Sequence, residues 1–556
     1  MTASHGHARF PVRLLIVAVG MSLGIGSIVA LPEPAHAAID CAAAPDDLAA
    51  LQAAIPAGGA AAVGLGPGFP ATVHTTQLAV PVGTDLTLDL CGRTLDLAPT
   101  IDGHAALSVP AGASLTILDS GGSGVLRATG ATGPAGTGAG AGIGGNGLTS
   151  SGHIRIHAGT VIATGGGASG AGIGGGAYGN GTVTITGGTI TATGGGASGA
   201  GIGGGGGHFV GRGAGTGTVT ITGGVITATA DAAAAIGGGG YGDNNVAGGP
   251  GSGFVTISGG EVTATSTRYG AAIGGGRTGT GIVQITGGHI VATGQLLNAP
   301  GLGSGVNGRG GEVVITGGHV TAAGAGGAVG VDSPPADSAP QLLRISGGVL
   351  NAQALGSRPA IGGDAANRVS AEIVGVELNG DPGPWVAGTP TGSDGVPATL
   401  TATGTGHAFT IDTSPTEMRI AFTTGLTLTS APTTATAGET ITVTASVLDH
   451  EGQPLADVSS RLTLTSSVAT DIISGNTVTF PTASPHTITA SFGGHTASFT
   501  VEVTGGLAAT GVADPLPLAL GGGLLLLLGG SLAVWAFRRR KTTGGTDGYP
   551  PFTPDP

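Results

Sequence analysis

The middle of the chain alternates apolar and hydroxyl side chains in short segments that are separated by pairs of glycines. In residues 181–193, for example, Val183, Ile185 and Ile190 alternate with threonines. A period of two places successive side chains on opposite faces of a β-strand. The glycine pair supplies the positive φ that a corner between two strands requires. The pattern therefore predicts two strands per unit, each with an apolar face turned inward and a threonine face turned outward.

This unit recurs along the chain. The second glycine of the pair reappears in steps of 36, 36, 28, 30 and 30 residues, and each unit ends on an isolated apolar residue among glycines, which predicts a third short strand. Stacked units of this length bury one continuous apolar column. We therefore expect an all-β chain whose residues 85–368 form a right-handed parallel β-helix solenoid with three strands per coil. The glycines are Gly188, Gly224, Gly260, Gly288, Gly318 and Gly348.

The sequence on either side of the repeats changes character. Residues 38–84 predict an N-terminal cap with a short helix over 46–55, and residues 86–90 read as the first strand of the solenoid. Residues 369–420 predict irregular coils or a C-terminal cap, which would protect the open end from edge pairing. Residues 421–504 contain less glycine and strands at short intervals, which favours a small antiparallel β-sandwich.

Composition narrows the class of protein. Glycine contributes 117 of the 556 residues, yet the absence of a strict Gly-X-Y period excludes collagen. The abundance of valine, isoleucine and threonine favours a folded β-protein over a disordered chain. The net charge is −13, and lysine and arginine are sparse and unclustered outside the C-terminal tail, which argues against nucleic-acid binding.

The N-terminus has the features of a secretory signal peptide over residues 1–37. Arg9 and Arg13 precede an apolar run, and residues 35–37 form a small-x-small cleavage site. In an exported chain the two cysteines, Cys41 and Cys91, predict one disulfide; two buried free thiols are the other interpretation. Lipid modification of Cys41 is disfavoured because Asp40 precedes it in place of a small residue.

The C-terminus contains three elements in order. A linker over 505–515 includes Leu507, Ala508, Ala509, Thr510 and Gly511. An apolar segment over 516–537 follows, and as a helix it would span about 33 Å, enough to cross a bilayer core. The basic cluster that follows predicts that residues 538–556 stay cytoplasmic and that transfer stops there. That cluster is Arg538, Arg539, Arg540 and Lys541.

This arrangement resembles a sortase cell-wall sorting signal, in the LAxTG variant of LPxTG associated with class E sortases of high-GC actinobacteria. The resemblance implies cleavage between Thr510 and Gly511 by a transiently bound sortase, followed by attachment of Thr510 to peptidoglycan. The membrane helix would then anchor the protein only before sorting. The other interpretation, supported by a tail over 542–556 that is longer than usual, is that the helix itself remains the anchor.

Two further resemblances concern the folded part. Residues 46–97 resemble the opening of pectate-lyase-like β-helix proteins, and residues 440–455 with 487–492 resemble bacterial Ig-like domains of surface proteins. The first resemblance implies enzymes that act on acidic polysaccharides with clustered carboxylates. The acidic residues of the repeats occupy different positions in their units, so the sequence predicts no catalytic residue and no enzyme. These acidic residues are Asp231, Asp243, Glu261, Glu312, Asp332 and Asp364.

His289 and His319 share a position in neighbouring units, which raises the question of a metal site. The equivalent residues elsewhere are Thr189, Val225 and Glu261, and a metal site would need a third ligand. We therefore expect no metal and no cofactor.

The outward threonines are the best candidate for a binding face. We expect Thr191, Thr227 and Thr263 to stack in one ladder, and Thr193, Thr229, Thr265 and Thr293 in another. The high β propensity of threonine would explain the same pattern without any ligand.

Together these features predict a cell-wall-anchored surface protein, an adhesin or scaffold that makes non-covalent contacts with glycans or cell surfaces. A polysaccharide lyase or glycoside hydrolase is the alternative, and an ice- or mineral-binding protein is a third.

Overall fold

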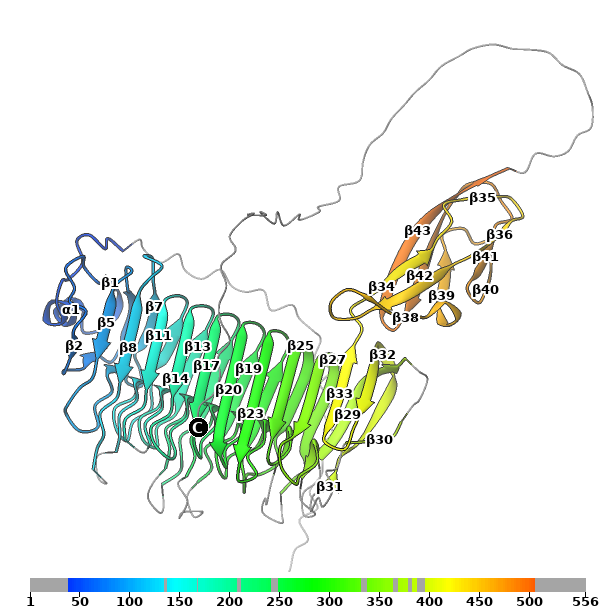
Figure 1. Ribbon diagram of the computed structural model, residues 1–556. Helices are drawn as coiled ribbons and strands as arrows, with labels where there is room; N and C mark the ends of the chain where they lie inside the picture. Colours follow the sequence, from blue (N-terminus) through cyan, green and yellow to red (C-terminus); the bar gives the residue numbers. More distant parts are fainter. Residues whose placement is uncertain are drawn as a thin grey trace, which may run out of the picture. The chain divides into compact units, whose positions relative to one another are not determined.

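The computed structural model describes residues 39–134, 138–167, 169–207, 212–241, 249–331, 338–363, 369–378, 383–387 and 396–505 (Figure 1). These residues are almost entirely β-structure. One α-helix, α1 (Leu48–Ala54), and one 3-10 turn, η1 (Ser459–Arg461), are the helical elements among them. The expectation of an all-β chain is confirmed at this level, and its two large sheets are built mainly from parallel strands.

We call residues 59–422 the repeat region. Its first strand in each unit pairs in parallel with the corresponding strand of the next unit, as the successive arrows in Figure 1 show. These strands are β1 (Gly59–Gly64), β4 (Thr84–Asp89), β7 (Ser114–Leu118), β10 (His153–Ile156), β13 (Gly181–Ile185), β16 (Gly217–Ile221), β19 (Gly253–Ile257), β22 (Gly281–Ile285), β25 (Glu312–Gly324), β27 (Gln341–Ala354), β29 (Val369–Glu377) and β32 (Thr399–Thr413).

A second strand follows in each unit and pairs in the same way. In β25 and β27 the first and second strands are continuous through the glycine pair. The separate second strands are β2 (Val73–His74), β5 (Thr94–Leu97), β8 (Val125–Thr129), β11 (Thr160–Thr164), β14 (Thr189–Thr193), β17 (Val225–Ala230), β20 (Glu261–Arg268) and β23 (His289–Leu296).

A third, very short strand closes each unit and belongs to a separate 11-stranded sheet. These strands are β3 (Leu78–Ala79), β6 (Leu107–Ser108), β9 (Ile143–Gly144), β12 (Ile173–Gly174), β15 (Ile202–Gly203), β18 (Ile236–Gly237), β21 (Ile273–Gly274), β24 (Leu302–Gly303), β26 (Val329–Val331), β28 (Ile361–Gly363) and β31 (Val396–Pro397).

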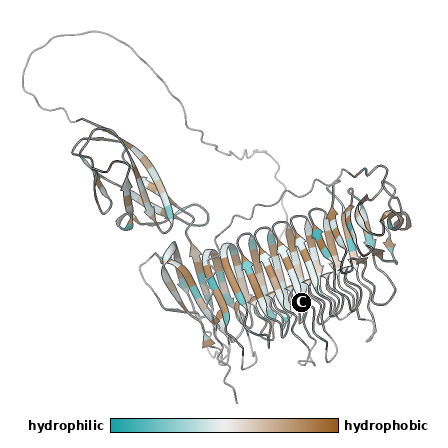
Figure 2. Ribbon diagram, turned by 180° about the vertical axis from the view of Figure 1, so that it is seen from behind, coloured by the Kyte–Doolittle hydropathy of each residue, from teal (hydrophilic) through white to brown (hydrophobic). Residues whose placement is uncertain are grey.

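The apolar side chains of successive units lie in register, which is why the repeats have a common core. Val183 is paired with Ile154 on one side and with Val219 on the other, and all three are buried. One cluster of buried side chains extends from Leu48 to Phe422. The alternation of hydropathy along the strands is visible in Figure 2. Burial of each valine or isoleucine contributes about 1.5–3 kcal/mol, so stability is distributed along the whole stack.

A glycine in the third strands β9, β12, β15, β18 and β21 allows the backbones of neighbouring units to approach closely. Gly203 has φ of +132°, and a Cβ atom built on it would lie 2.0 Å from the carbonyl oxygen of Gly237. Gly144, Gly174 and Gly237 make the same approach to the next unit. The recurring Ile-Gly ending thus combines one core side chain with one position at which no side chain fits.

At the N-terminal end, helix α1 begins after Asp47, whose side chain accepts a hydrogen bond from the N–H of Ala50, as an N-cap does. The side-chain amide of Gln52 donates to the carbonyl of Ala79 (2.9 Å) and accepts from its N–H (2.7 Å). Because Ala79 belongs to the first strand of the 11-stranded sheet, Gln52 satisfies an edge that a preceding strand would otherwise occupy.

The prediction that residues 86–90 form the first strand is wrong. Strand β1 precedes it and pairs with β4 in parallel, from Gly59 opposite Thr84 to Gly64 opposite Asp89. The predicted cap over 38–84 therefore contains a complete set of three strands. The sequence of β1, GAAAVG, has one branched side chain and no apolar–hydroxyl alternation, so the pattern that identifies the later strands is absent from it.

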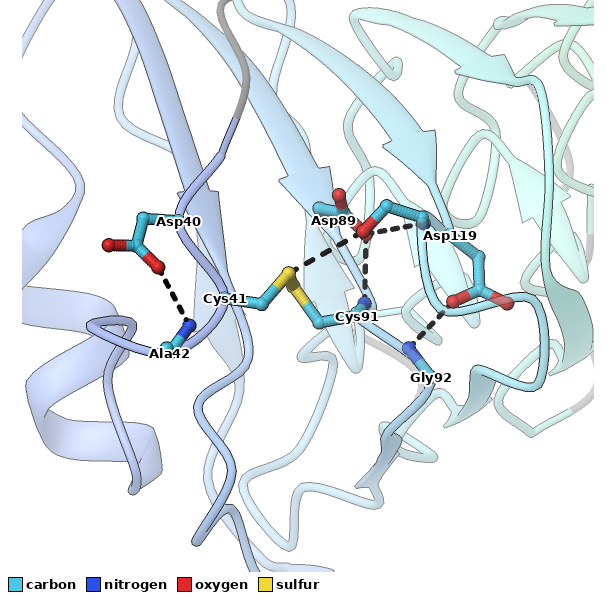
Figure 3. The surroundings of a disulfide bond; sticks show 8 residues. Asp40, Cys41, Ala42, Asp89, Cys91, Gly92 and Asp119 are labelled. Atoms are coloured by element: carbon cyan, nitrogen blue, oxygen red, sulfur yellow. Dashed lines mark hydrogen bonds between the residues drawn. A yellow bond between two sulfur atoms is a disulfide. The ribbon is translucent and has the colours of Figure 1, made fainter.

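The predicted disulfide between Cys41 and Cys91 is present, with Cα atoms 5.9 Å apart. Figure 3 shows that it joins the segment before α1 to the turn after β4. The carboxylate of Asp89 accepts the N–H groups of Cys91 and Ser120, at 2.8 and 2.9 Å, and so holds the turn on the repeat side of the bond.

At the C-terminal end the parallel order stops. Strand β33 (Glu417–Phe422) runs antiparallel to both β27 and β32, and the short strand β30 (Trp385–Val386) runs antiparallel to β32. Residues 369–420 were expected to be irregular coils or a cap; their described part contains β29, β32, which continues the parallel order, and the antiparallel strands β30, β31 and the start of β33.

Residues 425–504, which we call the C-terminal β region, have a core of their own that includes Val443, Phe480 and Val501. Their strands form three small sheets, in which all pairs are antiparallel except β35 with β43. They are β34 (Gly425–Ser430), β35 (Thr434–Thr436), β36 (Thr440–Thr442), β37 (Thr444–Leu448), β38 (Pro454–Asp457), β39 (Thr463–Ser466), β40 (Ile472–Ser474), β41 (Thr477–Thr479), β42 (Pro485–Phe492) and β43 (His495–Thr504).

Several predictions concern residues that the structure does not describe. The signal peptide over 1–37, the motif Leu507–Gly511, the apolar segment over 516–537 and the basic cluster that follows it lie outside the described residues. Within residues 39–505, the described segments contain no helix that is both long and apolar enough to span a bilayer.

Candidate binding face

The second strands of the central repeats present two parallel ladders of threonine. Thr191, Thr227 and Thr263 are consecutive register partners and all three are exposed. Two residues further along each strand, Thr193, Thr229 and Thr265 form the second ladder and are half-buried. Strand geometry gives such a grid a repeat of about 4.8 Å between units and about 6.6 Å along each strand. We call these six residues the threonine grid.

The second ladder is longer than the sequence suggested. Thr293 belongs to it as expected, and Thr164 and Thr129 extend it at the other end, so six threonines are in register across six units. The hydroxyl of Thr229 donates to that of Thr193 at 3.2 Å. Neither Thr129 nor Thr164 belongs to the TAT sequence that the three grid units share, although each ends an alternating segment in the same way.

The first ladder ends where apolar residues replace threonine. Ile162 is the register partner of Thr191 on one side, and Val291 is that of Thr263 on the other. The grid therefore has defined limits rather than extending over the entire repeat region. A ligand that contacts the hydroxyls of the first ladder would be confined to three neighbouring units.

A comparable ladder lies on the first strands. Thr184, Thr220 and Thr256 are register partners and half-buried, and their strands precede the same glycine corners. The register partner of Thr184 in the preceding unit is Arg155, so this ladder is bordered by a charge. These three threonines therefore provide a control for the threonine grid within the same protein.

His289 and His319 are register partners, as their shared position in the sequence predicts. Their ring centroids are 5.2 Å apart. The ladder continues to Glu261 on one side and to Val349 on the other. Nε2 of His319 is hydrogen-bonded to the side-chain amide of Asn351 at 3.1 Å, so this nitrogen already has a partner within the fold.

No two acidic residues of the described repeat strands are register partners in adjacent units. The register partners of Glu261 are Val225 and His289, and those of Glu312 are Ile282 and Leu342. Asp243, Asp332 and Asp364 lie outside the described residues.

Asp231 is paired instead with a cation one unit along. Its carboxylate accepts hydrogen bonds from Nε of Arg268 and from the hydroxyl of Thr267, each at 2.6 Å. Burial alone would raise the pKa of Asp231, but these hydrogen bonds and the Arg268 charge together lower it below its ordinary value. The carboxylate is therefore ionised and occupied in a structural ion pair.

In the described segments, one group of three potential metal donors has its ligand atoms within 4.8 Å of one another: Cys41, Asp89 and Cys91. Its two sulfurs are joined in the disulfide, and the Asp89 carboxylate accepts backbone N–H groups, so these atoms are already bonded within the protein.

Comparisons with known proteins add little. No protein-family model and no curated protein sequence matches the chain. Among solved structures, the crystal structure of domains 4 and 5 of the S-layer protein SbsC matches with 18% identity and a TM-score of 0.11. The match covers 22% of this chain and 65% of that one, just under two thirds of its length. So small a likeness carries no conclusion about the fold or the function of this chain.

Proposed function

We propose that this protein is exported, joined to the cell wall through Thr510 and used as a surface adhesin or scaffold. In this proposal the repeats wind as a right-handed parallel β-helix, and the C-terminal β region is an Ig-like sandwich that separates the helix from the anchor. The threonine grid is the face that contacts glycans or other cell surfaces.

The observation that carries the proposal is the grid itself: two in-register ladders of threonine hydroxyls. Hydroxyl groups both donate and accept hydrogen bonds, which suits them to a hydroxyl-rich ligand such as a glycan. The absence of facing carboxylates among the described repeat residues supports binding over hydrolysis, because glycoside hydrolysis requires two carboxylates that flank the scissile bond. The ordered signals at both ends of the sequence support the location.

The anchor is tested by the chemical state of the C-terminus. When the full chain is expressed in a host with a class E sortase, muramidase digestion is expected to release protein that ends at Thr510, as identified by mass spectrometry. The variant Thr510→Ala is expected to remain in the membrane fraction at full length, because the cleaved bond is altered. Thr542→Ala, beyond the basic cluster, serves as the control and should be sorted normally. Wild-type protein that retains residues 511–556 in the membrane fraction would support the permanent-helix interpretation instead.

The binding face is tested on intact cells that display the full chain. The triple variant Thr191→Val, Thr227→Val and Thr263→Val removes three hydroxyls and keeps a β-branched shape, so the fold should persist. We expect at least a tenfold loss of binding on a glycan array or in a cell-adhesion assay. The matched control places valine at Thr184, Thr220 and Thr256, and it should bind as wild type. Equal binding by both variants would exclude the grid as the contact face.

The regular spacing of the grid also favours a second candidate, binding to an ice or mineral lattice. Thermal hysteresis in solutions of the purified full chain would support it. Freezing at the equilibrium temperature, with no hysteresis, would remove ice from consideration.

A further inference from the structure

A hollow of about 640 Å³ lies where the last repeats meet the C-terminal β region, and three of its walls carry histidine. His407 comes from β32, His450 from the turn between β37 and β38, and His495 from β43. We call it the histidine groove. Its volume falls within the range of about 300–1,000 Å³ that small-molecule sites occupy, and such sites occur preferentially between domains.

Contacts between the repeat region and the C-terminal β region hold the groove walls together. Arg461 donates to the carbonyls of Glu377 and Leu378, and its guanidinium lies 4.7 Å from the centre of the Phe492 ring. The side chains of Leu378 and Ala408, both from the repeat region, are buried in the core of the C-terminal β region. Contacts that do not involve the groove histidines therefore hold the two sides of the groove together.

Histidines gather at this junction to an unusual extent. The rings of His407 and His495 are 4.9 Å apart, and those of His319 and His450 are 5.3 Å apart; each pair joins the two regions. With His289, whose ring meets that of His319 edge-on, five of the ten histidines in the described residues lie here.

The lining of the groove carries no carboxylate, although the chain as a whole is acidic. Asp and Glu outnumber Lys and Arg by 31 to 18 in the sequence, yet no acidic residue lines the groove. Arg419 of β33 faces His319, and Glu451 is the acidic group beside His450, at 3.8 Å. The nearby Asp449 carboxylate is occupied by the N–H groups of Glu451 and Gln453.

The remaining lining residues are uncharged: polar side chains, three glycines, Val374 and one aromatic ring. Hydroxyls come from Thr286, Thr316 and Thr423, an amide comes from Gln284, and the ring is that of Phe422. Hydroxyls and amides can hydrogen-bond a polar ligand body, while the ring offers an apolar surface. This combination suits a compact polyhydroxylated molecule.

We propose that the histidine groove binds a sugar-sized organic oxyanion, a sulfate ester or a carboxylate, and takes up protons as it does so. Protonated imidazoles supply the positive charge, and the hydroxyls and Gln284 contact the ligand body. The site is distinct from the threonine grid and does not depend on wall attachment.

The protonation of His319 and His495 determines whether anion binding strengthens or weakens as the pH falls. Burial lowers the pKa of His319, with further lowering by His289, His450 and Arg419 against the raising effect of Glu451. Burial also lowers the pKa of His495; its hydrogen bond to Thr423 raises that pKa and His407 lowers it. Both shifts favour the neutral form of His495, which lines the groove, and of His319, which lies beside it, and a bound anion restores the proton affinity that burial removed. Binding strengthens as the pH falls through the ordinary histidine value of about 6.5.

Isothermal titration of the full chain with glucose 6-sulfate, gluconate and neutral glucose, at pH 7.5 and pH 5.5, tests this proposal. Sulfate and carboxylate keep their charge over this interval, so any pH effect arises from the protein. Linkage of one proton contributes up to about tenfold in affinity per pH unit. We expect at least a tenfold gain for one or both anions at pH 5.5 and no gain for glucose; the stronger anion identifies the ligand class.

His450→Gln and His495→Gln remove one protonatable group each and keep a hydrogen-bonding side chain, so each should reduce the gain at pH 5.5 severalfold. Thermal unfolding curves of both variants must match the wild type to exclude a folding defect. His153→Gln, on β10 and away from the groove, is the control and should bind as wild type. Anion binding that is equal at both pH values, absent at pH 5.5, or equally reduced by His153→Gln would overturn the proposal.

Discussion

Replacement of Gly203 by alanine is expected to lower the free energy of unfolding of the repeat region by roughly 4 kcal/mol. Two costs add at this position. The φ of +132° is strained for any residue with a side chain, at about 1–3 kcal/mol, and the new Cβ would lie 2.0 Å from the Gly237 carbonyl oxygen, an overpacking that costs about 1–3 kcal/mol more. The oxygen cannot easily move because it accepts the N–H of Gly204 at 2.9 Å. Chemical denaturation followed by circular dichroism measures the loss.

The substitution Gly122→Ala measures the backbone cost without the packing cost. Its φ is also positive, at +75°, but no atom lies within 4 Å of a Cβ built there. Gly122→Ala should therefore cost about 1 kcal/mol, the penalty of the backbone conformation alone. If Gly203→Ala costs no more than Gly122→Ala, close packing of the third strands is not what requires glycine.

His486→Ala should destabilise the C-terminal β region by about 3–5 kcal/mol, because it removes the histidine partner of the buried Asp471 side chain and leaves only the Ser466 hydroxyl bonded to it. Both side chains are fully buried, and Nδ1 of His486 lies 2.7 Å from the Asp471 carboxylate. The opposite nitrogen, Nε2, is 3.0 Å from the hydroxyl of Ser484 and from the carbonyl of Thr482. The unfolding transition of this region, followed by amide hydrogen exchange, measures the effect.

The double variant His486→Leu with Asp471→Leu should recover much of the loss, since two apolar side chains leave no buried charge. Glu451→Gln breaks an exposed pair with His450 in the same region and should change stability by less than about 1 kcal/mol. A loss in His486→Ala no greater than that in Glu451→Gln would show that the buried pair contributes nothing specific.

The stacking of the repeats could be predicted because the sequence repeats its own pattern. Val183, Ile185 and Ile190 define a period of two, and the glycine pairs fix where each strand ends, so the register of the threonine grid follows directly. The same reasoning failed for β1, where small alanines replace the branched residues that reveal alternation.

Contacts between distant segments had no such signal. The histidine groove brings His407, His450 and His495 together from three separate strands and turns, and their spacing in the sequence is irregular. His450 also provides His319 with a second histidine neighbour that no repeat position predicted. The pairing of Asp471 with His486 likewise depends on how the strands of the C-terminal β region pack, which a single sequence does not encode in any local pattern.

The Gln52 amide has a consequence for the size of the molecule. It occupies the outer edge of the first short strand, while β33 turns back antiparallel on β27 at the other end, so both specialised termini are independent of the number of units between them. Each interior unit meets its neighbours through the same in-register contacts and contributes about 4.8 Å of length. Duplication or loss of one unit by recombination would therefore add or remove one strand in each ladder while leaving both ends intact.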